Sequence, residues 1–182
     1  GAFFASFPLF YSTSFSGAYW VWMAILFCFT LQAISYEFQS LPGNIYGKRT
    51  YKSFLFINGV LGTFLVGVVL ATFFTGSAFT MSKGNIAGVG SVGFVISQWQ
   101  SPGMGFEALF NLRNLALGFT VLFLARTMAT LYFINRLDHE VLQKRSHKYL
   151  LLNAIPFVVF FLVFVIWTLL SEGFAVNPET NE

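Results

Sequence analysis

Charged residues are scarce in this chain of 182 residues, because Asp, Glu, Lys and Arg together make up only 9% of it. Soluble domains contain about 25% charged residues. Hydrophobic residues account for 56% of the sequence and aromatic residues for 20%. So few charges cannot cover the surface of a soluble domain of this size, and the composition therefore predicts an integral membrane protein.

The chain also lacks the residue clusters on which most catalytic and metal sites depend. A single cysteine, Cys28, excludes an internal disulfide and a thiolate metal site. The two histidines, His139 and His147, lie in a predicted loop, whereas a haem in the membrane needs an axial His or Met inside a span. Met23 and Met128 are isolated in apolar runs, where methionine usually serves packing. With no phosphate-binding loop or nucleophile elbow either, the sequence alone predicts no catalytic, cofactor-binding or metal-binding residue.

Four apolar runs are long enough to cross a bilayer, which takes about 20 residues. They cover residues 17–36, 53–78, 106–135 and 149–170. Lipid satisfies no backbone hydrogen bond and four segments cannot close a barrel, so the runs are predicted to be helices. The predicted fold class is all-α, a polytopic integral membrane protein whose four transmembrane helices belong to a larger helical bundle. Residues 1–16 are expected to hold the end of a preceding helix and an outer turn.

Positive charge alternates between the loops. Residues 37–52 and 136–148 contain three and four Lys or Arg residues, whereas residues 79–105 contain one and residues 171–182 none. The positive-inside rule places the first two segments in the cytoplasm and the other two on the outer side. Residues 79–105 are rich in glycine and are predicted to form an outer loop, in which the stretch "GNIAGVGSVGF", residues 84–94, is interpreted as flexible. Basic clusters between apolar runs do not form a surface that follows a phosphate backbone, so no nucleic acid is expected as a partner.

Two arginines interrupt the third apolar run. A helix over residues 106–135 is about 45 Å long, so Arg113 and Arg126 would lie about 10 Å on either side of the middle of the membrane. Helical side chains lean toward the N-terminus, here the outer end, so Arg126 leans away from the cytoplasm. Arg113 either reaches the outer surface or takes part in an ion pair or a polar path. Glu37 is the nearby acid at a similar depth. We predict that Arg126 pairs with Glu37 or with a partner outside this chain.

Other polar residues in or beside the spans admit two interpretations each. Glu107 suits the N-terminus of the third helix, where an acid interacts well with the helix dipole, or it belongs to a polar path. Asn58 either forms hydrogen bonds between helices or contributes to such a path. We hypothesise that Glu37, with Arg126 and Gln32, forms the cytoplasmic end of a polar path.

Four segments, taken in order, resemble subunit II of the cytochrome bd quinol oxidases. "FASFPLFYSTSFSGAYW" is similar to the family's Pro and Tyr segment before an aromatic-anchored span, and "AISYEFQS" to the end of that span, with Gln39 in place of a basic residue. "FINGVLGTFLVGVVLATFFTG" resembles the following Gly-rich span, and "LALGFTVLFLARTMATLYFINRLDHEVLQKR" resembles the next long span with its basic hairpin.

The resemblance covers nearly the whole chain apart from residues 83–97, and it corresponds to the first half of that subunit without its opening helices. It implies a multi-pass protein of the prokaryotic plasma (inner) membrane, in a respiratory terminal oxidase that couples quinol oxidation to reduction of dioxygen to water. The expected partners are membrane lipid and subunit I, which forms a heterodimer with subunit II and carries the quinol site, two b-type haems and a d-type chlorin. The chain itself is expected to bind no cofactor. As a non-catalytic subunit, it would support subunit I and line an oxygen or proton path.

Two other functions fit the hydrophobic pattern. Half of a secondary transporter would show inverted repeats and broken helices, whereas the first two and last two runs show no mutual similarity. A small structural or assembly protein of the membrane is the third interpretation.

Overall fold

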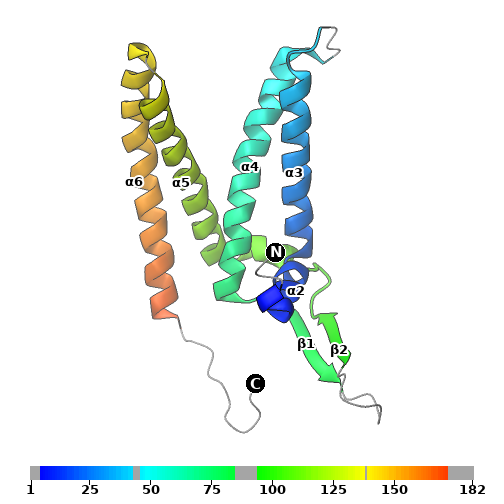
Figure 1. The fold of residues 1–182 in the computed structure, drawn as a ribbon. Coiled ribbons are helices and arrows are strands. Elements are labelled where there is room, and N and C mark those ends of the chain that lie inside the picture. The colour runs from blue at the N-terminus through cyan, green and yellow to red at the C-terminus, as the bar shows by residue number, and fades with distance from the viewer. Residues whose placement is uncertain (1–4, 43–45, 85–93, 138, 172–182) are drawn as a thin grey trace.

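The computed structural model of this protein describes residues 5–42, 46–84, 94–137 and 139–171 (Figure 1). Five α-helices, one 3-10 helix and two strands lie in this part of the chain. In order they are α2 (Pro8–Gly17), α3 (Tyr19–Phe38), α4 (Gly47–Thr75), β1 (Phe79–Gly84), β2 (Phe94–Trp99), η1 (Phe106–Phe110), α5 (Leu112–Arg136) and α6 (Glu140–Leu170). Helices α3 to α6 are long and apolar enough to cross a membrane, which confirms the all-α polytopic fold.

The helices alternate in direction, so the two basic loops lie at one end of the molecule and the β-hairpin at the other (Figure 1). We call these the basic end and the hairpin end. Helices α4 and α6 begin well before the predicted residues 53 and 149. The added stretches "GKRTYK" and "EVLQKRSHK" are polar but contain good helix formers, so each helix continues beyond its apolar part.

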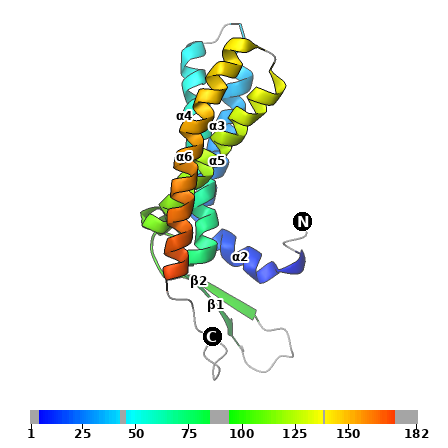
Figure 2. The same ribbon diagram turned by 90° about the vertical axis from the view of Figure 1, so that its left-hand side faces the viewer.

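The segment before the first span is itself helical. Helix α2 begins with Pro8, whose fixed φ suits the first helical turn, and ends where Ala18 leaves the helical conformation (φ −123°, ψ 38°). It lies at the hairpin end and points away from the axis of the long helices (Figure 2).

The outer loop predicted over residues 79–105 contains a β-hairpin, which was not predicted from the sequence. Strands β1 and β2 pair antiparallel from Phe79 opposite Trp99 to Gly84 opposite Phe94. Aromatic and β-branched residues in "FTMSKG" and "FVISQW" favour this conformation. The Gly-rich stretch between the strands, residues 85–93, lies outside the described residues.

The third span is not one continuous helix from residue 106. Phe106–Phe110 form the 3-10 helix η1, and Asn111 is extended (φ −82°, ψ 116°) before α5 begins at Leu112. The side-chain oxygen of Asn111 accepts a hydrogen bond of 3.0 Å from the backbone N–H of Arg113, which caps the helix. Arg113 therefore lies in the first turn of α5, nearer the end of the span than predicted.

Each long helix packs against the next one along the chain, and the pairs α3–α4 and α5–α6 diverge toward the basic end (Figure 1). Glycines allow α4 and α5 to meet near the hairpin end. A Cβ atom on Gly67 would lie 2.7 Å from the carbonyl oxygen of Leu117, and one on Gly118 would lie 2.8 Å from the ring of Phe64. Small residues at these positions therefore let the two backbones approach closely.

Candidate functional site

The structure places Arg113 at the hairpin end, where it bonds within its own chain. Its guanidinium Nη1 donates a hydrogen bond of 2.7 Å to the hydroxyl of Ser171, the residue that follows α6. Arg113 is partly buried. This contact joins the first turn of α5 to the last turn of α6, which is a structural role at the edge of the span.

Glu107 lies in the first turn of η1, ahead of the start of α5. Its carboxylate accepts hydrogen bonds from the hydroxyl of Ser101 and, at 3.0 Å, from the backbone N–H of Gly105. The bond from Ser101, followed by backbone donors, lowers the pKa of the Glu107 carboxyl below its ordinary value. The carboxylate thereby orders the turn that leads into the third span.

A small cavity of about 120 Å³ lies beside Glu107, between the hairpin end of α4 and η1. Asn114, only 1% exposed, closes one side of it. Its side-chain oxygen accepts a hydrogen bond of 2.8 Å from the hydroxyl of Thr75, and its amide N–H donates one of 3.0 Å to the carbonyl of Ala108. Both amide atoms are thus satisfied, so this residue fastens α4, η1 and α5 together.

Gln32 of α3 and Asn58 of α4 lie on neighbouring helices in the half of the bundle nearer the basic end. Asn58 is 6% exposed, and its amide nitrogen has no hydrogen-bond partner among the described residues. The amide nitrogen of Gln32 lies 3.6 Å from the point that a Cβ on Gly59 would occupy, so it faces the turn that carries Asn58. Ser35, 3% exposed, follows Gln32 by one turn on α3. These polar groups therefore lie inside an otherwise apolar interface.

Glu37 and Arg126 are not brought together. Glu37 is exposed in the last turn of α3, and Arg126 is exposed near the middle of α5. Helix α4 packs between the two helices that carry them (Figure 1). The structure thus groups Gln32 with Asn58 on the side of Glu37 and leaves Arg126 on another helix pair.

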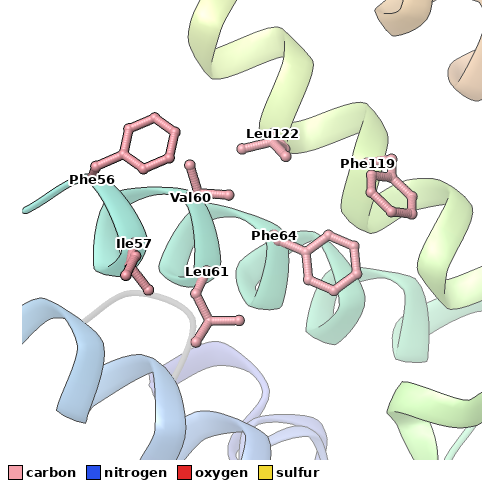
Figure 3. Close-up of a pocket in the computed structure, with 7 residues that line it drawn as sticks. All are labelled: Phe56, Ile57, Val60, Leu61, Phe64, Phe119 and Leu122. Atoms are coloured by element: carbon pink, nitrogen blue, oxygen red, sulfur yellow. The ribbon is translucent and has the colours of Figure 1, made fainter. Parts of the chain in front are cut away.

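Sequence reasoning missed an apolar cleft between α4 and α5. It has a volume of about 360 Å³ (Figure 3), and it lies between the two helix pairs, which diverge toward the basic end (Figure 1). Its lining comes wholly from apolar side chains, namely Phe56, Ile57, Val60, Leu61 and Phe64 of α4 with Phe119 and Leu122 of α5. Phe56, Val60 and Phe64 recur every four residues, which indicates one helix face, but this spacing did not show that the face would stay open.

No group of three or more His, Cys, Asp or Glu side chains lies close enough to share a metal ion within the described ranges. Met23 and Met128, the methionines of the spans, are 40% and 61% exposed on α3 and α5, which are separated by α4. They lie at opposite halves of the bundle, so they do not form a facing pair of haem ligands.

Comparisons with known proteins identify the family. No curated protein and no solved structure matches the chain. The family profile described as cytochrome bd terminal oxidase subunit II matches residues 1–178, nearly the whole sequence. This match also selects the oxidase subunit over the transporter and the assembly protein. With its four membrane-spanning helices, the chain belongs to the family of cytochrome bd terminal oxidase subunit II.

Proposed function

We propose that this chain is a haem-free, non-catalytic subunit of a terminal oxidase that oxidises quinol and reduces dioxygen to water. In this proposal it supports a subunit I that carries two b-type haems and a d-type chlorin in a prokaryotic inner membrane. The family match over residues 1–178 carries the proposal. The described spans offer no facing His or Met pair that fits a haem, so no step of the reaction is assigned to this chain.

The surfaces of the spans support the scaffold role. In the most apolar stretch of each helix, 39% of the residues of α4 are buried within the chain, against 17% for α5 and 11% for α6. Helix α4 is therefore the core of this unit, while α5 and α6 present apolar faces outward. Within a membrane such faces are covered by lipid or by other helices. The family match implies a complex with a partner subunit, and in this proposal that partner is subunit I.

We further propose that α3 and α4 line the first part of a proton path. Glu37 would be its mouth at the basic end, predicted to face the cytoplasm, and Gln32 and Asn58 would continue it inward. Glu37 and Gln32 are about 7.5 Å apart along the axis of α3 at 1.5 Å per residue. The buried amide nitrogen of Asn58 favours an ordered water, because an unsatisfied donor in an apolar interior is costly. Arg126, which lies on another helix pair, has no place in this path.

Purification through a tag on this chain tests the oxidase function. The complex should consume oxygen when a quinol is supplied, and the consumption should stop when this chain is separated from its partner. The separated chain should retain no haem. A complex without quinol-dependent oxygen consumption, or haem that stays with this chain, would contradict the proposal.

A further inference from the structure

Arg126 is a charge near the middle of a span. At 1.5 Å per residue it lies about 21 Å from the first residue of α5 and about 15 Å from the last, Arg136. Its side chain is exposed, and a guanidinium keeps its charge in any protein environment. Ionisable residues at this depth are expensive unless they meet a partner group, so Arg126 requires one.

Arg126 lies on the face of α5 that lines the apolar cleft. Leu122 is one turn before it and Phe119 two turns before it, and both line the cleft (Figure 3). Arg126 is not itself one of the seven lining residues, but helical side chains lean toward the N-terminus, which directs its guanidinium along this face toward the cleft. A single surface therefore combines an apolar groove with a positive charge at its open side.

The described part of this chain supplies no counter-ion. Glu107 is bound to Ser101 and Gly105 at the hairpin end, and Glu37 lies beyond α4. Glu140 is exposed in the first turn of α6, at the basic end. No ion pair joins Arg126 to any of these described acids.

Lipid is a poor partner for Arg126. Headgroups gather beyond the apolar part of the span, at about the level of Arg136, and the side chain of Arg126 leans the other way. A water-filled pocket is also disfavoured, since all seven residues of the cleft are apolar. A carboxylate held at the same depth by another transmembrane helix would neutralise the charge, and apolar side chains of that helix would complement the cleft.

We propose that a transmembrane helix of the partner subunit packs into the cleft between α4 and α5 and that its Asp or Glu carboxylate forms an ion pair with Arg126. The identity of the partner as a subunit of the oxidase rests on the assembly proposed above, whereas the ion pair and the packing into the cleft do not. The pair fixes the depth of the partner helix, and the apolar groove supplies the packing surface.

Replacement of Arg126 tests the ion pair in the intact complex. Arg126→Gln should lower the amount of partner that copurifies with the tagged chain severalfold, and Arg126→Lys should retain much of it. Arg113→Gln is the matched control, because Arg113 bonds to Ser171 of its own chain, and it should leave copurification unchanged. Equal copurification of the Arg126→Gln and wild-type complexes would overturn the proposal.

A cross-link identifies the occupant without removing the charge. A photoreactive phenylalanine derivative in place of Leu122 should link to a membrane span of the partner, and the linked peptide should contain a carboxylate near the middle of that span. Attachment to lipid, to this chain or to no protein would overturn the proposal. If such a preparation still consumes oxygen with quinol, only the inference about Arg126 fails, whereas a preparation without that activity counts against the oxidase function itself.

Discussion

The two ends of the α4–α5 pair differ in how closely the helices pack and in whether their polar groups find partners within the chain. At the hairpin end the backbones touch through Gly67 and Gly118, and Asn114 uses both of its amide atoms in hydrogen bonds. Toward the basic end the same helices diverge around an apolar cleft, and Arg126 has no counter-ion among the described residues. The hairpin end therefore holds this unit together, while the basic end is shaped for contacts beyond it.

Aromatic rings also join α5 to α6. Phe160 of α6 stacks on Phe119 at 5.2 Å and on Phe123 at 6.0 Å between ring centroids. Nearer the hairpin end, Ala71, Ala116 and Phe164 form a small buried cluster from three helices. The three helices α4, α5 and α6 thus share a buried cluster near the hairpin end.

The largest expected effect is on the close approach of the backbones. Gly67→Ala places a methyl group 2.7 Å from the carbonyl oxygen of Leu117, and backbone cannot move aside cheaply. We expect a loss of about 3 kcal/mol in stability, as for overpacked cores. Gly59→Ala on the same helix meets only the Gln32 amide at 3.6 Å and is the control. Thermal unfolding followed by size-exclusion chromatography gives the melting temperature of each variant. Equal melting temperatures for Gly67→Ala and Gly59→Ala would contradict the close approach of α4 and α5 at Gly67.

The next effect comes from the buried amide at the hairpin end. Asn114→Ala removes the side-chain acceptor of the Thr75 hydroxyl, which keeps the carbonyl of Ala71 at 3.2 Å, and the side-chain donor to the carbonyl of Ala108. The loss of these two buried hydrogen bonds should cost about 2 kcal/mol. Asn111→Ala removes only an exposed helix cap and should cost about 1 kcal/mol. Chemical denaturation in detergent compares the two variants. A cost for Asn111→Ala that matches or exceeds the cost for Asn114→Ala would show that the buried amide does not fasten this end.

A smaller, functional effect is expected at the basic end. Glu37→Gln removes a group that can bind and release a proton, so quinol-driven proton uptake by reconstituted complexes should fall severalfold while the assembly stays intact. Glu140→Gln, an exposed acid at the same end, should leave uptake unchanged. Stopped-flow measurements with a pH dye distinguish them, and normal uptake in the Glu37→Gln complex would remove Glu37 from the path.

The smallest effect is the pH dependence of the turn before α5. Hydrogen bonds lower the pKa of Glu107, so their stabilising effect is complete above the ordinary carboxyl pKa of about 4.3 and is lost as the pH falls through the lowered value. The melting temperature of the wild type should therefore decline more than that of Glu107→Gln when the pH falls below about 4.3. Parallel curves for the two proteins would contradict this role.

The spans could be predicted because burial in lipid requires long apolar runs, and local sequence is enough to recognise them. The start of α5 was missed because the apolar residues of η1 continue the run, although Asn111 carries the signal of a helix cap. The hairpin was missed because the many glycines between its strands indicated a loop, and the two strands are short segments whose β-propensity is a weak signal by itself. Its strands are fastened to α2 by the indole of Trp99, which donates a hydrogen bond of 2.9 Å to the carbonyl of Ser16.

The site was harder to predict because depth in the membrane does not fix which helices are neighbours. Glu37 and Arg126 were predicted to pair because they lie at a similar depth in the membrane, yet α4 lies between their helices. Gln32 and Asn58, by contrast, are on consecutive helices, and the short loop between α3 and α4 makes such helices pack side by side. The cleft depends on the divergence of two helix pairs, which no local pattern encodes.

The most direct test of the account is a dithionite-reduced minus oxidised visible spectrum of the complex that copurifies with this chain from its native membrane. We expect bands of b-type haem together with a far-red chlorin band, all of which leave with the partner when the subunits are separated. A colourless preparation containing intact protein would contradict the account.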